Sequence, residues 1–253
     1  MKSRTAIAIF TIVNKENLFE DFKNNLNEQR DIFYKLVAIY NCNGEYNAAR
    51  RAYNENATID DVKYYVFLHP DIRFQDAMAL SDIIDYIEQI NDFGVAGVAG
   101  ARKSETGRDI VSNIVQGKQK KRVGMSITCP TSVQTIDECL FVIKRDYFIN
   151  HRFSDRTGWH LYSVEYCLNA LLNGKRNYVV PGRIWHISAG ESLDDKYMIQ
   201  LESLINEYKN RFDVICTTVK AWNTRGVSAY LYRIIYKIKQ KIKRMCIKTI
   251  SRN

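Results

Sequence analysis

A histidine and an aspartate directly follow a hydrophobic, strand-like run of the chain. The run is Tyr64–Leu68, and His69-Pro70-Asp71 comes next. In an open, mostly parallel sheet the ligand crevice lies at the carboxyl ends of the strands, so these two side chains can face a bound phosphate or a metal ion. The alternative is structural: Asp71 caps the helix that follows, and His69 is an ordinary strand-end residue.

Two further polar and aromatic clusters lie at expected element boundaries. One is Gly158-Trp159-His160-Leu161-Tyr162, with Glu165 close behind, and the other is Trp185-His186-Ile187-Ser188-Ala189-Gly190. Three such junctions in one chain favour a functional site over three unrelated structural details.

Strand-like runs alternate with helical patterns along the chain. This alternation predicts an α/β fold with a mostly parallel sheet flanked by helices. The expected strands are 6–13, 36–40, 64–68, 95–99, 138–143 and 178–181, and the expected helices are 18–26, 48–54, 74–90 and 164–172. Residues 101–131 are rich in Lys, Arg, Ser, Gly and Gln and predict a long loop or excursion near the site.

The charge of the chain is concentrated at its C-terminal end. The chain has 253 residues, a hydrophobic fraction of 46% and a formal net charge of +9. Ten of the 37 basic residues and none of the 28 acidic residues lie in 214–253. We therefore expect a near-neutral α/β domain over 1–213 and a basic tail over 214–253. The six cysteines show no CxxC spacing, which indicates a reducing compartment.

The tail predicts a basic amphipathic helix over 227–250. Such a helix lies in the headgroup region of anionic membranes. The alternatives are a helix packed on the body with a solvated lysine face, or a nucleic-acid contact, which no aromatic-interleaved motif supports. The apolar stripe is Leu231, Ile234, Ile235, Ile238, Ile242 and Met245, and the basic residues off it are Arg233, Lys237, Lys241, Arg244 and Lys248.

Taken in order, these pieces resemble a family 2 type glycosyltransferase with the GT-A fold, and in particular the glycosyltransferase-like subgroup whose strand ends in His-x-Asp. The resemblance covers most of residues 5–190. It rests on the motifs Phe67–Ile72, Gly94–Ala101, Asp137–Arg145, Gly158–Tyr162 and Trp185–Gly190.

The resemblance implies a donor site that contains a divalent metal. In such enzymes a strand-end Asp-x-Asp holds the ribose and, through Mg²⁺ or Mn²⁺, the diphosphate of a nucleotide sugar. In this chain Asp71 corresponds to the second Asp of that motif, and His69 stands in place of the first Asp. This difference leaves strict metal dependence open. His186 resembles the histidine that completes the metal or diphosphate site; the alternative is a core histidine beside Trp185.

The resemblance also implies further donor contacts. They fall on Val13 and Asn14 after the first strand, Asn41 after the second, Asn54 in the next helix, and Arg102 near the diphosphate. Each Asn is also an ordinary turn or helix-end residue, and Arg102 is equally consistent with a solvated loop charge.

The general base is the least defined part of the resemblance. The position where the family has its acid reads Ser163, which cannot act as a base at neutral pH. The candidates are Glu165, Asp137 and His160, and Glu165 and Asp137 also have structural readings at a helix start and a turn. Trp159 and Tyr162 are expected to bind the acceptor.

We therefore expect transfer of a sugar from a nucleotide-diphosphate sugar to an acceptor hydroxyl, with inversion. The setting would be cytoplasmic, peripheral on the inner face of the cell membrane, in polysaccharide or glycolipid synthesis with a glycan or lipid-linked acceptor. A nucleotidyltransferase would need a Gly-rich phosphate loop after the first strand, and 11–15 has no glycine. The alternative outside enzymology is a non-catalytic, membrane-associated module that binds a nucleotide or glycan.

Overall fold

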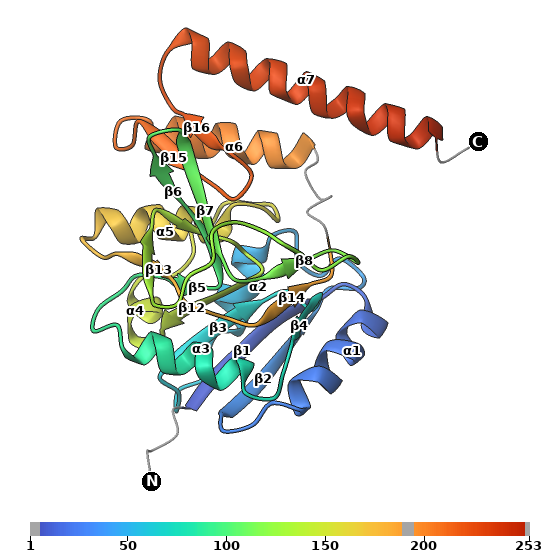
Figure 1. Cartoon of the computed structure of the whole chain (residues 1–253), viewed down its shortest axis with the longest axis vertical. Helices are drawn as coiled ribbons and strands as arrows, with labels where there is room; N and C mark the ends of the chain where they lie inside the picture. Colours follow the sequence, from blue (N-terminus) through green and yellow to red (C-terminus); the bar gives the residue numbers. More distant parts are fainter. Residues whose placement is uncertain (1–5, 189–194, 251–253) are drawn as a thin grey trace.

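A seven-stranded sheet forms the centre of the protein (Figure 1). The computed structural model describes residues 6–188 and 195–250, with side chains in the last helix described to Lys239 and at Ile242. The strand order is β10 (Thr131–Val133), β13 (Asn177–Val179), β5 (Ala96–Gly97), β12 (Leu140–Lys144), β3 (Tyr64–Leu68), β1 (Ala6–Val13) and β2 (Phe33–Tyr40). β12 is antiparallel to β3 and β5, and β10 is antiparallel to β13, while the other neighbours are parallel. The predicted mostly parallel α/β fold is confirmed.

Helices cover both faces of this sheet, which explains why its strands read as continuous hydrophobic runs. All five residues of β3 are buried, and they alternate between two cores. Tyr64, Val66 and Leu68 pack with α1 (Glu16–Asn27) and α3 (Ala79–Glu88). Tyr65 and Phe67 pack on the other face, where α2 (Ala49–Asn56), α4 (Arg145–Asn150) and α5 (Tyr162–Leu172) lie.

Short strands replace two of the expected segments. The helix expected over 74–90 is shorter, because β4 (Ile72–Phe74) precedes it and α3 begins at Ala79. The excursion over 101–131 contains β7 (Gly107–Ser112), β8 (Val115–Gln116) and β9 (Lys121–Arg122). β7 forms a hairpin with β6 (Ala99–Ser104), to which β11 (Thr135–Ile136) adds a third strand. β14 (Ile184–His186) lies between β4 and β8 in a separate small sheet.

The segment that follows the predicted domain boundary at 213/214 is in contact with the body. β15 (Val214–Cys216) and β16 (Ala221–Asn223) form a hairpin that is bonded to the body. The Gln134 side chain donates to the Val214 carbonyl at 2.9 Å and accepts from the Cys216 N–H at 2.6 Å. Trp222 of the hairpin is 1% exposed and packs with α6 (Asp195–Tyr208), a helix that the sequence reading did not include.

The predicted C-terminal helix is present as α7 (Val227–Ile250), and it packs on the body through an unexpected face. Ala229, Arg233 and Tyr236 face the body, and Arg233 is only 5% exposed. Its guanidinium donates to Glu202 of α6 at 2.7 and 3.2 Å and to the Asn223 carbonyl at 2.8 Å. Helix packing is therefore organised around a paired arginine.

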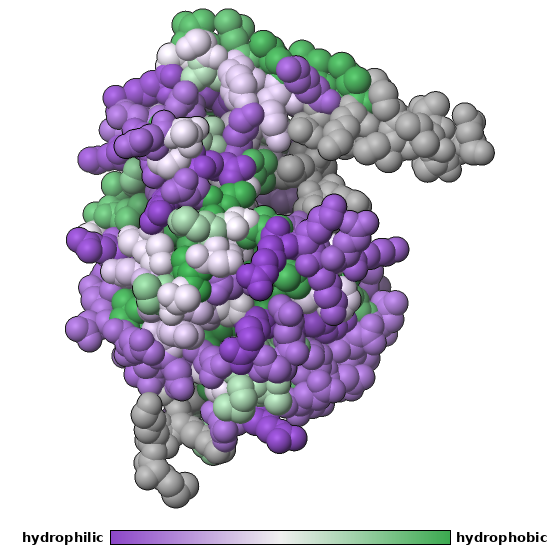
Figure 2. Space-filling model, in the orientation of Figure 1, coloured by the Kyte–Doolittle hydropathy of each residue, from purple (hydrophilic) through white to green (hydrophobic). Residues whose placement is uncertain are grey.

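The described part of the apolar stripe of α7 points away from the body. Leu231, Ile235, Ile238 and Ile242 are each 50–52% exposed. The first three follow Ala229, Arg233 and Tyr236 by two positions, which is about 200° around a helix. Figure 2 shows hydrophobic side chains along the outer side of α7.

Among the described residues, no helix combines the length and the hydropathy needed to cross a bilayer.

Candidate functional site

A cavity of about 820 Å³ lies at the carboxyl ends of β1 and β3. Residues after β1, after β3, before β12 and at the start of α5 line it, together with β14, the β15–β16 turn and α7. This is the edge of an open sheet at which ligands bind in α/β proteins. The cavity brings together the following predicted residues: Asn14, His69, Asp71, Asp137, Trp159, His160, Tyr162 and His186.

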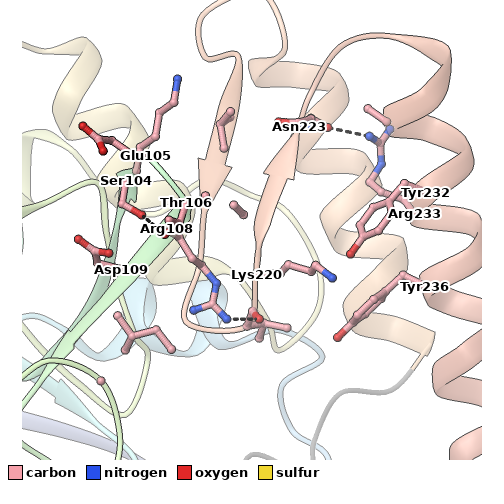
Figure 3. A pocket seen from close by; sticks show the side chains of 18 of the residues that line it. Ser104, Glu105, Thr106, Arg108, Asp109, Lys220, Asn223, Tyr232, Arg233 and Tyr236 are labelled. Atoms are coloured by element: carbon pink, nitrogen blue, oxygen red, sulfur yellow. Dashed lines mark hydrogen bonds between the residues drawn. The ribbon is translucent and has the colours of Figure 1, made fainter.

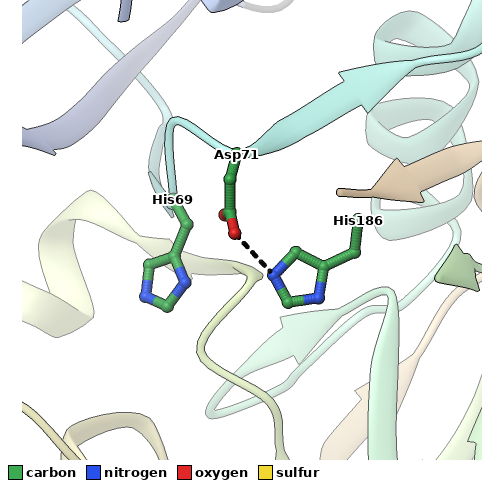
Figure 4. A group of neighbouring side chains, drawn as sticks. All are labelled: His69, Asp71 and His186. Carbon is green, nitrogen blue, oxygen red and sulfur yellow. Dashed lines mark ion pairs between the residues drawn. The ribbon is translucent and has the colours of Figure 1, made fainter. Parts of the chain in front are cut away.

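His69, Asp71 and His186 form one compact group (Figure 4). Their ligand atoms all lie within 4.8 Å of one another. Strand pairing creates this proximity, because His186 of β14 is opposite Ile72 of β4 and the Ile187 N–H donates to the Asp71 carbonyl at 2.9 Å. Two histidines and an acid that are far apart in sequence therefore meet through the small sheet.

The electrostatics of this group favour an ionised Asp71. Its Oδ2 lies 3.3 Å from His186 Nε2. Burial raises the pKa of Asp71, but the hydrogen bond and charge of His186, together with His69, lower it well below its usual range. Burial lowers the pKa of His69, whose Nε2 lies 2.9 Å from the Tyr162 hydroxyl. Burial also disfavours charge on His186, but Asp71 outweighs it and raises the pKa of His186.

The group fits a divalent metal ion. Asp71 Oδ1 is buried and has no hydrogen-bond partner among the described residues. Burying a carboxylate oxygen without a partner costs folding free energy unless a ligand or an ion contacts it. Two imidazoles and one carboxylate suit a transition-metal ion better than Mg²⁺, which prefers an octahedral shell of oxygen ligands.

Asp137 and Glu138 place two adjacent carboxyl groups in the same cavity. The Thr218 hydroxyl donates to Asp137 Oδ2 at 2.6 Å, so the β15–β16 turn holds this residue. Glu138 Oε1 accepts from the Tyr162 N–H at 2.8 Å, at the start of α5. Burial first, and then the charge of Asp137, raise the pKa of Glu138 to about 8. Glu138 was not among the predicted site residues, although two consecutive acids before a strand were a signal for it.

Trp159, His160 and Tyr162 line the cavity at the entrance to α5. The His160 N–H donates to Gln200 Oε1 of α6 at 3.1 Å, and its ring lies edge-on to Tyr197 with centroids 5.7 Å apart. Leu161 adopts a left-handed conformation with φ of 60°, which turns the chain into the helix. α6 therefore fixes the position of this loop.

Glu165, one of the three candidate bases, is held in a buried ion-pair network. Its side chain is 3% exposed and does not line the cavity. Oε2 accepts from buried Arg50 at 2.7 and 2.6 Å, while Oε1 accepts from Ser154 at 2.8 Å and Arg156 at 3.0 Å. With both oxygens engaged, Glu165 joins α5 to α2.

Asn54 and Arg102 were also predicted to bind the donor, but they lie outside the lining of the cavity. The Asn54 amide is occupied by the Phe153 backbone, donating to its carbonyl at 2.9 Å and accepting from its N–H at 3.1 Å. Arg102 pairs with Asp109 across the β6–β7 hairpin at 3.2 Å.

The residues after β1 and β2 act together. Asn41 donates to the Asn14 side chain at 3.1 Å, and only Asn14 of the two lines the cavity. Val13 is buried, and its carbonyl accepts from the Asn41 N–H at 2.8 Å. Val13 and Asn41 are therefore supports for Asn14. Ala189 and Gly190, the end of the third predicted motif, lie outside the described residues.

Comparisons with known proteins bear on the family and the fold of this chain. A family model described as "Glycosyltransferase like family" matches residues 8–208. A curated protein of Fuscovulum blasticum, "ATP synthase subunits region ORF 6", is 26% identical over 160 residues, which are 59% of this chain and 61% of that protein. The match thus spans less than two thirds of that relative.

A solved structure shares the fold. The mannosyltransferase PcManGT from Pyrobaculum calidifontis, in complex with GDP-Man and Mn²⁺, matches with a TM-score of 0.55 and 11% identity. The match covers 83% of this chain and 64% of that chain. The central sheet and its flanking helices therefore have the GT-A architecture.

Proposed function

Because the chain belongs to the glycosyltransferase-like family and has the GT-A fold, we propose that it transfers a sugar from a nucleotide-diphosphate sugar to an acceptor hydroxyl. The predicted family and fold are confirmed by these matches, and the reaction is the proposal that they support. One observation carries it: a cavity at the sheet edge contains both the metal-compatible group His69, Asp71 and His186 and the carboxyl pair Asp137 and Glu138.

The donor side of the proposal rests on charge. His69, Asp71 and His186 would hold a divalent cation, which would offset the negative charge of the departing diphosphate. Asn14 and Lys15 line the same cavity and can contact the nucleotide. The nucleotide sugar and Mn²⁺ named for the archaeal mannosyltransferase support this class of donor.

On the acceptor side, we propose Glu138 as the general base. A base works best when its pKa lies near the working pH, and Glu138 has a pKa of about 8. The acceptor oxygen forms a bond to the anomeric carbon while the bond from that carbon to the diphosphate oxygen breaks. The acceptor proton moves to a Glu138 oxygen. A single displacement of this kind inverts the anomeric centre. Burial, and after it the charge of Asp137, keeps the pKa of Glu138 high, and Trp159 and His160 line the acceptor path.

We propose that α7 binds an anionic membrane surface and so brings the enzyme to a glycan or lipid-linked acceptor on the cytoplasmic face. Two features support this. The apolar stripe is exposed on the side opposite the body, and Lys237 and Lys239 are exposed on either side of it. This arrangement disfavours the alternative in which the stripe packs on the body. A role in polysaccharide or glycolipid synthesis follows from that location.

A thermal-shift panel tests the donor site. UDP, GDP, dTDP and CMP are each added with Mn²⁺, with Mg²⁺ or with EDTA. We expect one nucleotide to raise the melting temperature, because a ligand at 100 times its Kd adds about 2.7 kcal/mol of stability. The rise should be larger with Mn²⁺ than with Mg²⁺, because two imidazoles and one carboxylate suit a transition-metal ion better.

Asp71→Asn and His186→Ala should each raise the Mn²⁺ concentration needed for a half-maximal shift at least about tenfold. Lys121→Gln, on exposed β9 outside the cavity, is the matched control. Shifts that survive both substitutions, or the absence of any shift, would contradict the proposed donor site and favour a non-catalytic binding module.

A further inference from the structure

Tyr162 connects the metal group to the carboxyl pair. Its hydroxyl lies 2.9 Å from His69 Nε2, and its N–H donates to Glu138 Oε1 at 2.8 Å. The sequence led us to expect an acceptor contact from Tyr162, whereas its hydroxyl is in contact with a residue of the metal group. Since one residue makes both contacts, the position of Tyr162 affects a candidate metal ligand and the proposed base together.

The surroundings of Tyr162 hold it in place. Its side chain is buried, and its ring packs against those of Tyr53 and Phe141 with centroid distances of 5.8 and 6.0 Å. The next residue, Ser163, donates its hydroxyl proton to the Ile136 carbonyl at 2.5 Å and so ties the start of α5 to β11. Side chains packed this closely have little room to move. Tyr162 is therefore a fixed point from which another side chain can be oriented.

The two ring nitrogens of His69 have different neighbours. Nε2 is on the side of Tyr162, and Figure 4 shows the other nitrogen, Nδ1, on the side of Asp71. The main chain of His69 is held separately, because its N–H donates to the Cys139 carbonyl at 3.0 Å. The bond to Tyr162 thus acts on the imidazole ring, which the contact of the main chain does not orient.

The proton of the Tyr162 hydroxyl is directed to a second tyrosine. Burial raises the pKa of both Tyr162 and Tyr53, and the hydrogen bond between their hydroxyls raises that of Tyr162 further and lowers that of Tyr53. Tyr162 is therefore the donor in this pair. Its oxygen can then accept the proton of His69 Nε2, and a neutral imidazole protonated at Nε2 has a lone pair at Nδ1.

We propose that Tyr162 is a positioning residue of the metal site, whose oxygen accepts from His69 Nε2 and so presents Nδ1 to a metal ion shared with Asp71 and His186. Histidines that bind metals donate their second ring N–H to a fixed acceptor in this way. The inference rests on the proposed donor site and adds a residue on which the metal affinity of that site depends.

Titration of the full chain with MnCl₂ alone tests the proposal, with unbound Mn²⁺ followed by electron paramagnetic resonance. Tyr162→Phe removes the hydroxyl but keeps the ring and the N–H that bonds Glu138, so its fold is expected to survive. We expect the Kd for Mn²⁺ to rise about 10–100-fold, the usual effect of losing the partner of a metal-bound histidine.

A double-mutant cycle shows whether Tyr162 acts through His69. In the His69→Ala background the histidine is gone, so Tyr162→Phe should change the Kd for Mn²⁺ by less than about twofold. The absorption spectrum of bound Co²⁺ gives a second readout, because it responds to the atoms that coordinate the ion. At saturating Co²⁺ the spectrum of Tyr162→Phe should shift toward that of His69→Ala, whereas loss of stability alone would leave it unchanged.

Two other tyrosines provide matched controls. Tyr166 is about one turn further along α5, and its buried hydroxyl has no hydrogen-bond partner among the described residues. Tyr236 of α7 lines the site cavity and also a second cavity of about 1170 Å³, which the β6–β7 and β15–β16 hairpins complete (Figure 3). No residue of the metal group lines that second cavity. Tyr166→Phe and Tyr236→Phe should each keep the Kd for Mn²⁺ within about twofold of that of the parent.

The outcomes separate this inference from the donor site on which it rests. An unchanged Kd in Tyr162→Phe, the same fold-change in the His69→Ala background, an unshifted Co²⁺ spectrum or an equal loss in either control would overturn the inference and leave the donor site standing. Absence of Mn²⁺ binding by the unchanged protein would instead overturn the metal group itself, and the role of Tyr162 with it.

Discussion

Glu138 is the residue on which the proposed chemistry depends most directly. Replacing it with Gln keeps an acceptor for the Tyr162 N–H but removes the base. We expect sugar transfer to fall about 10²–10⁴-fold, the usual contribution of a positioned base. In the unchanged protein the rate should rise with pH through about 8, as the carboxyl group ionises. Donor-binding shifts should be retained in the variant, and an unchanged rate would show that another group takes the proton.

The same raised pKa has a consequence for stability. The folded-state pKa of Glu138, about 8, lies above the ordinary value of 4.5, so the folded protein holds a proton that the unfolded chain releases. The stabilisation is complete below pH 4.5 and is lost as the pH rises through 8. Glu138→Gln should therefore be more stable than the parent at pH 9 and closer to it at pH 4.5. Urea unfolding at both pH values measures this, and parallel pH profiles would contradict it.

Glu165 is expected to matter for stability and not for chemistry. Glu165→Ala leaves buried Arg50 without its partner, which costs about 3–5 kcal/mol of unfolding free energy. The exposed pair Arg51–Glu55 provides the control, because Glu55→Ala should cost less than about 1 kcal/mol. Denaturant unfolding measures both. Equal costs for the two variants would refute the structural role.

Sequence reasoning identified strand-end residues that the structure brings into one cavity, and it did not foresee side-chain partners that are far away in the chain. His69, Asp71 and His186 were identifiable because the ends of sheet strands converge. The partners of Glu165 and Asn54, which are Arg50 and Phe153, are 115 and 99 residues away in the chain. No local pattern reveals such pairs.

At the scale of elements, α7 is distinguished by which face it leaves exposed. Ile235→Glu combined with Ile238→Glu should weaken binding to anionic vesicles by at least about tenfold, because each buried side chain of this size is worth about 1.5–3 kcal/mol. Stability should change little, since both residues are half exposed. Ile199→Glu, on exposed α6 surface, is the matched control. Vesicle co-sedimentation measures binding, and retention by the double variant would remove the support for a membrane role.

The elements themselves were predicted unevenly. Long buried strands were recovered because they are continuous hydrophobic runs, and α7 was recovered because its helical periodicity is strong. α6 was missed, although Met198, Leu201, Ile205 and Tyr208 follow helical spacing. Strands as short as β8 and β9, with two residues each, carry too little pattern to be recognised and depend on their neighbours for hydrogen bonds.

For the whole molecule, the structure predicts different outcomes for two truncations. A chain ending at 226 keeps the β15–β16 hairpin, whereas one ending at 213 loses Trp222 and the partners of Gln134. Loss of a buried Trp side chain alone costs about 3–5 kcal/mol. At about 2–4 °C per kcal/mol, the shorter chain should melt at least about 6 °C below the longer one. Calorimetry measures the two melting temperatures, and equal values would support a domain boundary at 213/214.

The ion pair between Arg233 and Glu202 has a geometric consequence. It joins α7 to α6, and α6 in turn holds the loop that carries His160. With α7 lying on a membrane as proposed, the plane of the lipid headgroups would stand at a constant height relative to Glu138. Only an acceptor hydroxyl at that distance above the bilayer would then reach Glu138. After one further sugar is added, the terminal hydroxyl of the glycan would lie beyond the reach of Glu138.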